Sequence, residues 1–230
     1  MRIGILQCGH VPEAVAATHG DFADMFARLL DGHGFAFRTW NVVDMAFPQG
    51  PHDAEGWLVT GSKHGAYDDL PFIAPLEALI REIHAARAPL VGVCFGHQIV
   101  AQALGGRVEK WQGGWALGRQ TYRVEGLGEV ALNAWHQDQV TEIPPEARVV
   151  GEAPGCRVAA LAYGDHAWTI QPHPEFAPAL VADYIRGRRG TGDYPDDRMA
   201  AAEAALALPV DQARVAARMA RVLKGAPVHA

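Results

Sequence analysis

The sequence contains few cysteines, no excess of positive charge and no long apolar run. Three cysteines in 230 residues are an odd number without a disulfide framework, which favours a reduced, cytoplasmic compartment. A formal net charge of −6 and the lack of a long basic run argue against nucleic-acid binding. No stretch approaches the roughly 20 apolar residues that a membrane span needs. The first six residues indicate a strand rather than an export signal, so we expect neither a membrane protein nor a secreted one.

Two kinds of binding motif are also missing. No segment fits the G-x-x-x-x-G-K-[ST] pattern that cradles the phosphates of ATP. The histidines do not have the spacing of metal ligands. We therefore expect no metal and no cofactor. With 49% hydrophobic residues, the chain can nevertheless bury a full core without disulfides.

Apolar strand patterns alternate with helical patterns along much of the chain, which predicts an α/β fold with a mainly parallel sheet flanked by helices. Short alternating runs broken by glycines, between about residues 107 and 150, predict a small antiparallel extension. A helix is expected after residue 176, then a polar break at 187–197, then one or two amphipathic helices. The other predicted elements are strands at 1–6, 35–40, 56–60 and 89–93 and helices at 21–30 and 71–87.

The most informative segment is residues 92–98, with the sequence G-V-C-F-G-H-Q. An apolar run predicts a buried strand just before it, and helical spacing begins just after it, so Cys94 falls on a strand-to-helix turn. Glycines on both sides permit the strained backbone and close packing of a nucleophile elbow. Free amides at the helix start would stabilise a thiolate. The alternative for a lone cysteine in an apolar strand is an inert core residue.

A second segment, residues 171–176, supplies a candidate partner for the thiol. His173 and Glu175 are two residues apart, which places both side chains on one face of an extended segment. The carboxylate can then orient the imidazole while the other ring nitrogen faces the thiol. On its own, the segment fits a surface turn better than a catalytic pair. Together with the elbow it predicts a Cys94, His173, Glu175 triad.

These segments resemble the class I glutamine amidotransferases, of the GMP-synthase glutaminase type, which carry a G-x-C-x-G-x-Q elbow and a late H-P-E segment. Residues 58–62 and 136–140 match, in position, the oxyanion loop and the H-G-D-K-V-like loop of that family. The resemblance covers about residues 1 to 190. It implies a flavodoxin-like sheet, a catalytic domain over 1–192 and a helical tail over 193–230 packed on the same domain.

The resemblance also implies roles for residues around the triad. The oxyanion donors would be the backbone amides of Ser62 and Phe95. Gln98 lies one helical turn after Cys94 and can face the same pocket, although it could instead bridge loops. We expect His97 to make a structural hydrogen bond. The implied substrate-binding residues are Gly61, Gln98, His136, Gln137 and Asp138.

The implied reaction is attack of Cys94 on the γ-carbonyl of glutamine or of a γ-glutamyl peptide, followed by hydrolysis of a γ-glutamyl thioester. The loop at 60–69 and the H-Q-D segment depart from the GMP-synthase pattern and resemble stand-alone γ-glutamyl peptidases. In that case Lys63, His64 and Tyr67 are candidates to contact the group beyond the scissile bond. Stand-alone hydrolysis of a small γ-glutamyl substrate is one hypothesis, and supply of ammonia to a separate synthetase partner is the other.

Two further classes of function stay open. A catalytically silent binding or regulatory subunit would keep the fold, although the complete set of Cys94, His173 and Glu175 argues against it. A different cysteine hydrolase on a flavodoxin-like sheet would carry its histidine soon after the elbow instead of in a late H-P-E segment. The position of the base separates these alternatives.

Overall fold

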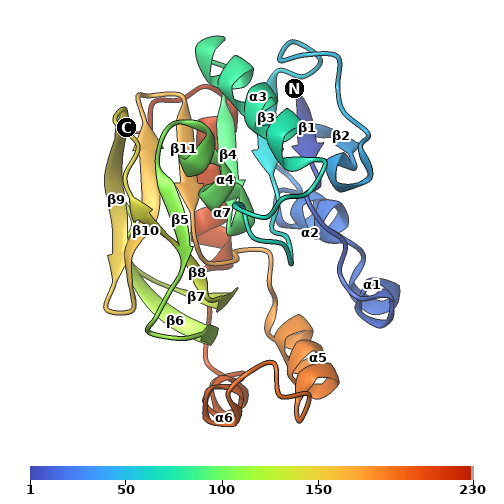
Figure 1. Cartoon of the computed structure of the whole chain (residues 1–230), viewed down its shortest axis with the longest axis vertical. Coiled ribbons are helices and arrows are strands. Elements are labelled where there is room, and N and C mark those ends of the chain that lie inside the picture. Colours follow the sequence, from blue (N-terminus) through green and yellow to red (C-terminus); the bar gives the residue numbers. More distant parts are fainter. Residues whose placement is uncertain (229–230) are drawn as a thin grey trace.

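The central sheet divides into a parallel half and an antiparallel half (Figure 1). In the computed structural model, which describes residues 1–228, nine strands have the order β2-β1-β3-β4-β11-β10-β9-β6-β7. Neighbours from β2 to β11 are parallel and neighbours from β11 to β7 are antiparallel. The predicted α/β class with an antiparallel extension is confirmed. The parallel strands are β1 (Arg2–Leu6), β2 (Ala36–Trp40), β3 (Gly56–Val59), β4 (Leu90–Val93) and β11 (Ala167–Ile170).

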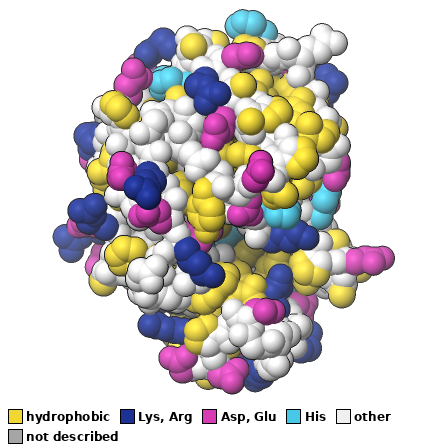
Figure 2. Space-filling model, viewed as in Figure 1, with side chains coloured by type: hydrophobic (Ala, Val, Ile, Leu, Met, Phe, Trp, Pro, Cys, Tyr) yellow, Lys and Arg dark blue, Asp and Glu magenta, His cyan; other side chains and the backbone are white. Residues whose placement is uncertain are grey.

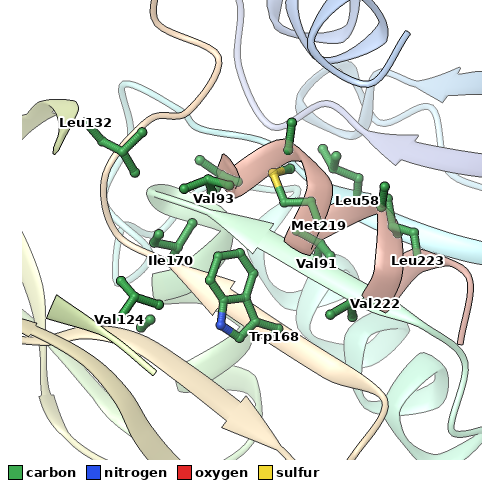
Figure 3. Close-up of a cluster of buried hydrophobic side chains, with 14 of the residues drawn as sticks. Leu58, Val91, Val93, Val124, Leu132, Trp168, Ile170, Met219, Val222 and Leu223 are labelled. Carbon is green, nitrogen blue, oxygen red and sulfur yellow. The ribbon is translucent and has the colours of Figure 1, made fainter. Parts of the chain in front are cut away.

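Helices cover both faces of the parallel half. Every residue of β3, β4 and β11 is buried, as expected for strands that are packed on two sides. Helices α2 (Phe22–Leu29) and α7 (Gln212–Leu223) contribute to the core on one face, and α3 (Ile73–Ala85) and α4 (Phe95–Ala103) to the core on the other. Figure 3 shows the first of these cores, with Met219 and Leu223 of α7 beside Leu58 and Val91 of the sheet.

The antiparallel half extends further along the chain than the sequence predicts. It continues past residue 150 and includes β10, which was not predicted. This strand lacks a clear alternating pattern, because it is buried on both faces over most of its length. A separate two-stranded sheet pairs β5 (Arg107–Lys110) with β8 (Asp138–Glu142). The antiparallel strands of the main sheet are β6 (Ala116–Val124), β7 (Gly128–His136), β9 (Ala147–Ala153) and β10 (Cys156–Tyr163).

Three further α-helices and one 3₁₀ helix (Val42–Asp44) complete the described chain. Helices α5 (Pro178–Arg188) and α6 (Asp196–Ala204) lie at the lower end of the molecule in Figure 1, and the predicted polar break separates them. Helix α1 (Glu13–His19) was not predicted, because it has seven residues and only Val15 is buried. The helix predicted from residue 71 begins two residues later.

The C-terminal segment contributes to the main core. Helix α7 buries Val215, Met219 and Leu223 in the same cluster as residues of β4 and β11. The division of the chain at residue 192 stays a prediction. No helix within residues 1–228 has the length and apolarity that crossing a membrane requires.

Candidate active site

Cys94 lies at a strained turn between β4 and α4. Its φ of 54° and ψ of −106° are unusual for a residue with a side chain. A Cβ on Gly96 would lie 2.2 Å from the carbonyl oxygen of Val59, and a Cβ on Gly92 would lie 2.6 Å from the carbonyl oxygen of Gly96. Both glycines are therefore required by close backbone packing, as the sequence pattern predicts. Cys94 is 5% exposed at this turn.

His173 follows β11 and is fixed on several sides. Its backbone N–H donates to the carbonyl of Asn133 at 2.8 Å. Its Nδ1 lies 2.7 Å from Oε1 of Glu175, and the two side chains are 3% and 0% exposed. Phe176 stacks on the imidazole with a centroid distance of 3.9 Å, and a Cβ on Gly61 would lie 2.9 Å from the ring. The imidazole thus has one defined position.

The charges around His173 favour its protonated form. Burial alone would lower the pKa of this imidazole, but the negative charges of Cys94 and Glu175 outweigh it and raise the pKa above the ordinary value. A protonated imidazole next to a cysteine stabilises the thiolate, which is the reactive form of the residue. The structure thus brings together the three residues of the predicted triad.

The two amides that were predicted to bind an oxyanion are those of Ser62 and Phe95. Phe95 is the first residue of α4, so its N–H has no partner inside the helix. Ser62 follows β3, the strand next to β4. Within residues 1–228, neither amide donates a hydrogen bond. Both are therefore available to an oxyanion, and their role as the oxyanion pair stays a prediction.

A cavity of about 720 Å³ is lined by Cys94 and His173. Its other lining comes from the loops after β1 and β3, the β7–β8 connection and the region around α5. Figure 2 shows a hollow on this face, with hydrophobic side chains inside it and Lys or Arg side chains at its rim. The predicted residues that line the cavity are Ser62, Lys63, His64, Tyr67, Gln98, His136, Gln137 and Asp138.

The predicted substrate-binding residues do not all have the same surroundings. The amide nitrogen of Gln98 donates to the carbonyl of Asp138 at 2.8 Å and to Oε1 of Gln171 at 3.1 Å, so this residue bridges two loops. His136 is buried, and burial followed by the charge of His173 lowers the pKa of His136 to about 3. Gly61 packs against the ring of His173.

His97 makes the structural hydrogen bonds that the sequence analysis expected. Its ring nitrogens lie 2.7 Å from Oγ1 of Thr169 and 3.1 Å from the carbonyl oxygen of Val158. Because burial lowers the pKa of His97 to about 4, the ring is neutral at neutral pH. In the part of the chain that the structure describes, no group of three or more His, Cys, Asp or Glu side chains is arranged to hold a metal ion.

Sequence reasoning missed a large part of the cavity lining. No local pattern connects these residues, which come from segments as distant as residues 10 and 194. The available signals are that Trp135 directly precedes the predicted loop at His136 and that Phe176 ends the segment with the predicted His–Glu pair. The missed residues that we use below are Lys110, Trp115, Trp135, Phe176, Tyr184, Arg188 and Tyr194.

The elbow, the His–Glu pair and the free amides have the arrangement of a cysteine-dependent acyl-transfer enzyme on an α/β sheet. The family model for glutamine amidotransferase class-I matches residues 58–185, and the chain belongs to this family. Members of the family are enzymes, and a cysteine nucleophile is typical of them.

The similar proteins include peptidases and a synthase. Gamma-glutamyl peptidase 4 of Arabidopsis thaliana is 30% identical over 188 residues, which cover 75% of each chain. Gamma-glutamyl peptidase 3 of the same plant is 26% identical over 75% of this chain and 76% of its own. The glutamine-hydrolyzing GMP synthase of Thermus thermophilus is 36% identical over 68% of this chain, but that region is only 32% of the synthase.

Solved structures have the same fold. A glutamine amidotransferase from Methylobacillus flagellatus superposes with a TM-score of 0.76 over 98% of this chain and 94% of its own, at 22% identity. A glutamine amidotransferase from Thermotoga maritima gives a TM-score of 0.73 over 97% and 96%, at 20% identity. At these identities the likeness supports the fold alone.

Proposed function

We propose that this chain hydrolyses the γ-glutamyl amide bond of glutamine or of a γ-glutamyl peptide through Cys94, His173 and Glu175. The observation that carries the proposal is the buried His173–Glu175 pair, 2.7 Å apart, which shares a cavity with a cysteine on a strained elbow. The covalent intermediate is a γ-glutamyl thioester.

The reaction proceeds in two halves. The Cys94 thiolate attacks the γ-carbonyl carbon, and the amides of Ser62 and Phe95 donate to the oxygen as it becomes negative. Protonated His173 gives its proton to the leaving nitrogen when the C–N bond breaks. A water molecule then attacks the thioester, His173 takes its proton, and glutamate leaves as the thiolate is restored. Glu175 holds the imidazole in one orientation throughout.

The cavity carries both signs of charge that a γ-glutamyl head requires. Asp138 can hold the α-amino group, while Lys63 and Lys110 can hold the α-carboxylate. This proposal moves Lys63 from the group beyond the scissile bond, where the sequence analysis expected it, to the glutamyl head. Burial raises the pKa of Asp138, and the nearby Tyr67 hydroxyl and Lys110 charge act in the opposite direction. These two neighbours offset the effect of burial only in part, so the pKa of Asp138 stays above its ordinary value, and a bound ammonium group would favour the ionised carboxylate.

The size of the cavity supports a substrate larger than glutamine. A volume of about 720 Å³ lies in the range of roughly 300 to 1,000 Å³ that is usual for ligand pockets. It leaves room for a leaving group larger than ammonia. The similarity to peptidases of comparable length is a second support. We therefore place stand-alone hydrolysis of γ-glutamyl peptides first.

A second candidate function is supply of ammonia to a separate synthetase. The similarity to a glutamine-hydrolyzing GMP synthase favours it, because the matched region covers only 32% of that enzyme and leaves the rest of it to a separate function. A silent regulatory subunit is less favoured, since it would need neither the His173–Glu175 pair nor the free amides near Cys94.

The proposal is tested by measuring glutamate release from glutamine and from a panel of γ-glutamyl peptides that includes glutathione. The purified chain is compared with a Cys94→Ala variant. Turnover of a peptide that exceeds turnover of glutamine and disappears in the variant supports stand-alone hydrolysis. Weak turnover of every substrate supports the glutaminase subunit, and identical rates for both proteins contradict the nucleophile assignment.

A further inference from the structure

A continuous series of aromatic rings leads away from His173 along one side of the cavity. We call Phe176, Tyr184, Trp135, Tyr194 and Trp115 the aromatic wall, and all five line the cavity. Phe176 stacks on His173, and the successive centroid distances from Phe176 to Trp115 are 5.5, 5.2, 5.3 and 4.6 Å. Trp115, Trp135 and Tyr194 are only partly buried, so their surfaces are available to a ligand.

Arg188 is the cation of this region. Its guanidinium lies 4.6 Å from the ring centroid of Tyr184, 5.9 Å from that of Trp135 and 5.7 Å from that of Tyr194. Its Nε donates to the hydroxyl of Tyr194 at 3.1 Å. Within the described residues, its two Nη groups have no hydrogen-bond partner. Neighbouring Arg186 is different, because it forms an ion pair with Asp183 and does not line the cavity.

The direction of the wall identifies which part of a substrate it faces. His173 gives its proton to the leaving nitrogen, so the leaving group has to lie next to this imidazole. The wall begins at Phe176, which is stacked on the same imidazole. Of the residues proposed for the glutamyl head, Lys63 belongs to the loop after β3, which contributes no residue to the wall. The wall is therefore on the leaving-group side.

We propose that the aromatic wall and Arg188 form the leaving-group subsite, and that the preferred substrates are γ-glutamyl derivatives of an aromatic amino acid with a free carboxylate. Aromatic rings favour offset or edge-to-face contact with another ring. The free guanidinium fork matches a carboxylate in a bidentate geometry. Hydrolysis breaks the γ-carbonyl C–N bond, adds water, and releases glutamate and the aromatic amino acid. This inference rests on the proposed function.

The first test compares kcat/KM for γ-glutamylphenylalanine, γ-glutamylalanine and γ-glutamylphenethylamide. The phenyl ring should raise kcat/KM about tenfold or more over alanine, as a filled apolar pocket does. γ-Glutamylphenethylamide lacks the carboxylate, so its kcat/KM should be about tenfold lower than that of γ-glutamylphenylalanine, which is the effect of one charged hydrogen bond. Equal kcat/KM for the phenylalanine and alanine substrates would overturn the inference.

Variants test whether these residues cause the preference. Arg188→Gln should reduce the ratio of γ-glutamylphenylalanine to γ-glutamylphenethylamide turnover about tenfold. Trp115→Leu should reduce the ratio of γ-glutamylphenylalanine to γ-glutamylalanine turnover about threefold. Arg186→Gln, on the same helix but outside the cavity, is the matched control and should leave both ratios unchanged. A change in the control equal to that in Arg188→Gln would overturn the role of Arg188.

A binding measurement separates this inference from the proposed function. Calorimetry with Cys94→Ala should show that γ-glutamylphenylalanine binds more tightly than γ-glutamylalanine, and that adding Arg188→Gln weakens binding about tenfold. If this preference is seen but the wild-type chain hydrolyses neither peptide, the subsite is supported and the proposed hydrolysis is wrong. If Cys94-dependent hydrolysis is seen without a preference, the hydrolysis is supported and the subsite is wrong.

Discussion

Two sides of the cavity are held in different ways. The side formed by β3, β4 and α4, which we call the elbow wall, is fixed by backbone packing that leaves no room for a Cβ at Gly92 or Gly96. The aromatic wall is held by ring contacts and by the guanidinium of Arg188. The elbow wall can therefore fix the chemistry, while side chains of the aromatic wall can change without disturbing the backbone around Cys94.

The largest expected effect is on the reactive atom of the elbow wall. Cys94→Ser should lower turnover roughly 10⁴-fold or more, because an unactivated hydroxyl replaces a thiolate at a site where the residues act as a unit. Glutamate release by the purified variant measures the loss, and circular dichroism checks that the fold is retained. Substantial activity in a folded variant would contradict the role of Cys94.

The next effect concerns the histidine that anchors α4 to the sheet. The pKa of His97 is lowered to about 4 by burial, from an ordinary value of 6.5. The neutral ring is the form that the fold accepts, so its contribution to stability is complete above pH 6.5 and is lost as the pH falls toward 4. The free energy of unfolding should decrease by about 3 kcal/mol across this window. Denaturation by urea at pH 7 and pH 4.5 measures it.

A His97→Gln variant is the comparison for that experiment. Its side chain keeps a donor and an acceptor but does not titrate, so it should show a smaller decrease between the two pH values. An equal decrease would mean that other groups, such as buried His136, cause the acid sensitivity.

A smaller effect, on stability, distinguishes the backbone of the elbow wall from the backbone beside Arg188. Gly96→Ala should destabilise the fold by about 2 kcal/mol, because its Cβ would lie 2.2 Å from the oxygen of Val59. Gly187→Ala, in helix α5 near Arg188, has no atom within 4 Å and should stabilise the helix by up to about 1 kcal/mol. Thermal unfolding measures both, and equal shifts would contradict the difference between the walls.

The smallest expected effect is on the orientation of the base. Glu175→Gln should lower kcat/KM about tenfold, because one charged hydrogen bond to His173 is weakened. His173→Ala should cost more, since it removes the proton donor. The negative charge of Glu175 is one cause of the raised pKa of His173, so the alkaline decline in activity should move to lower pH in Glu175→Gln. A pH–rate profile measures this shift, and an unmoved alkaline limb would contradict the charge effect.

Much of the elbow wall and of the predicted triad could be predicted, because their sequence signals are local. The glycines that flank Cys94, the apolar run of β4 and the two-residue spacing of His173 and Glu175 each indicate one structure by themselves. Helix α1 and strand β10 were not predicted, because a short exposed helix and a strand that is buried over most of its length lack a clear hydrophobic period.

The sequence by itself determined the strand-to-helix elbow, the order of the catalytic segments and the α/β class, since each depends on residues close together in the chain. Only the tertiary structure decided which residues stand opposite the triad. Trp115, Tyr184 and Tyr194 come from separate elements and meet because the antiparallel half and α5 are folded around the same cavity. Contacts between distant segments depend on how the elements pack, and no spacing within one segment specifies that packing.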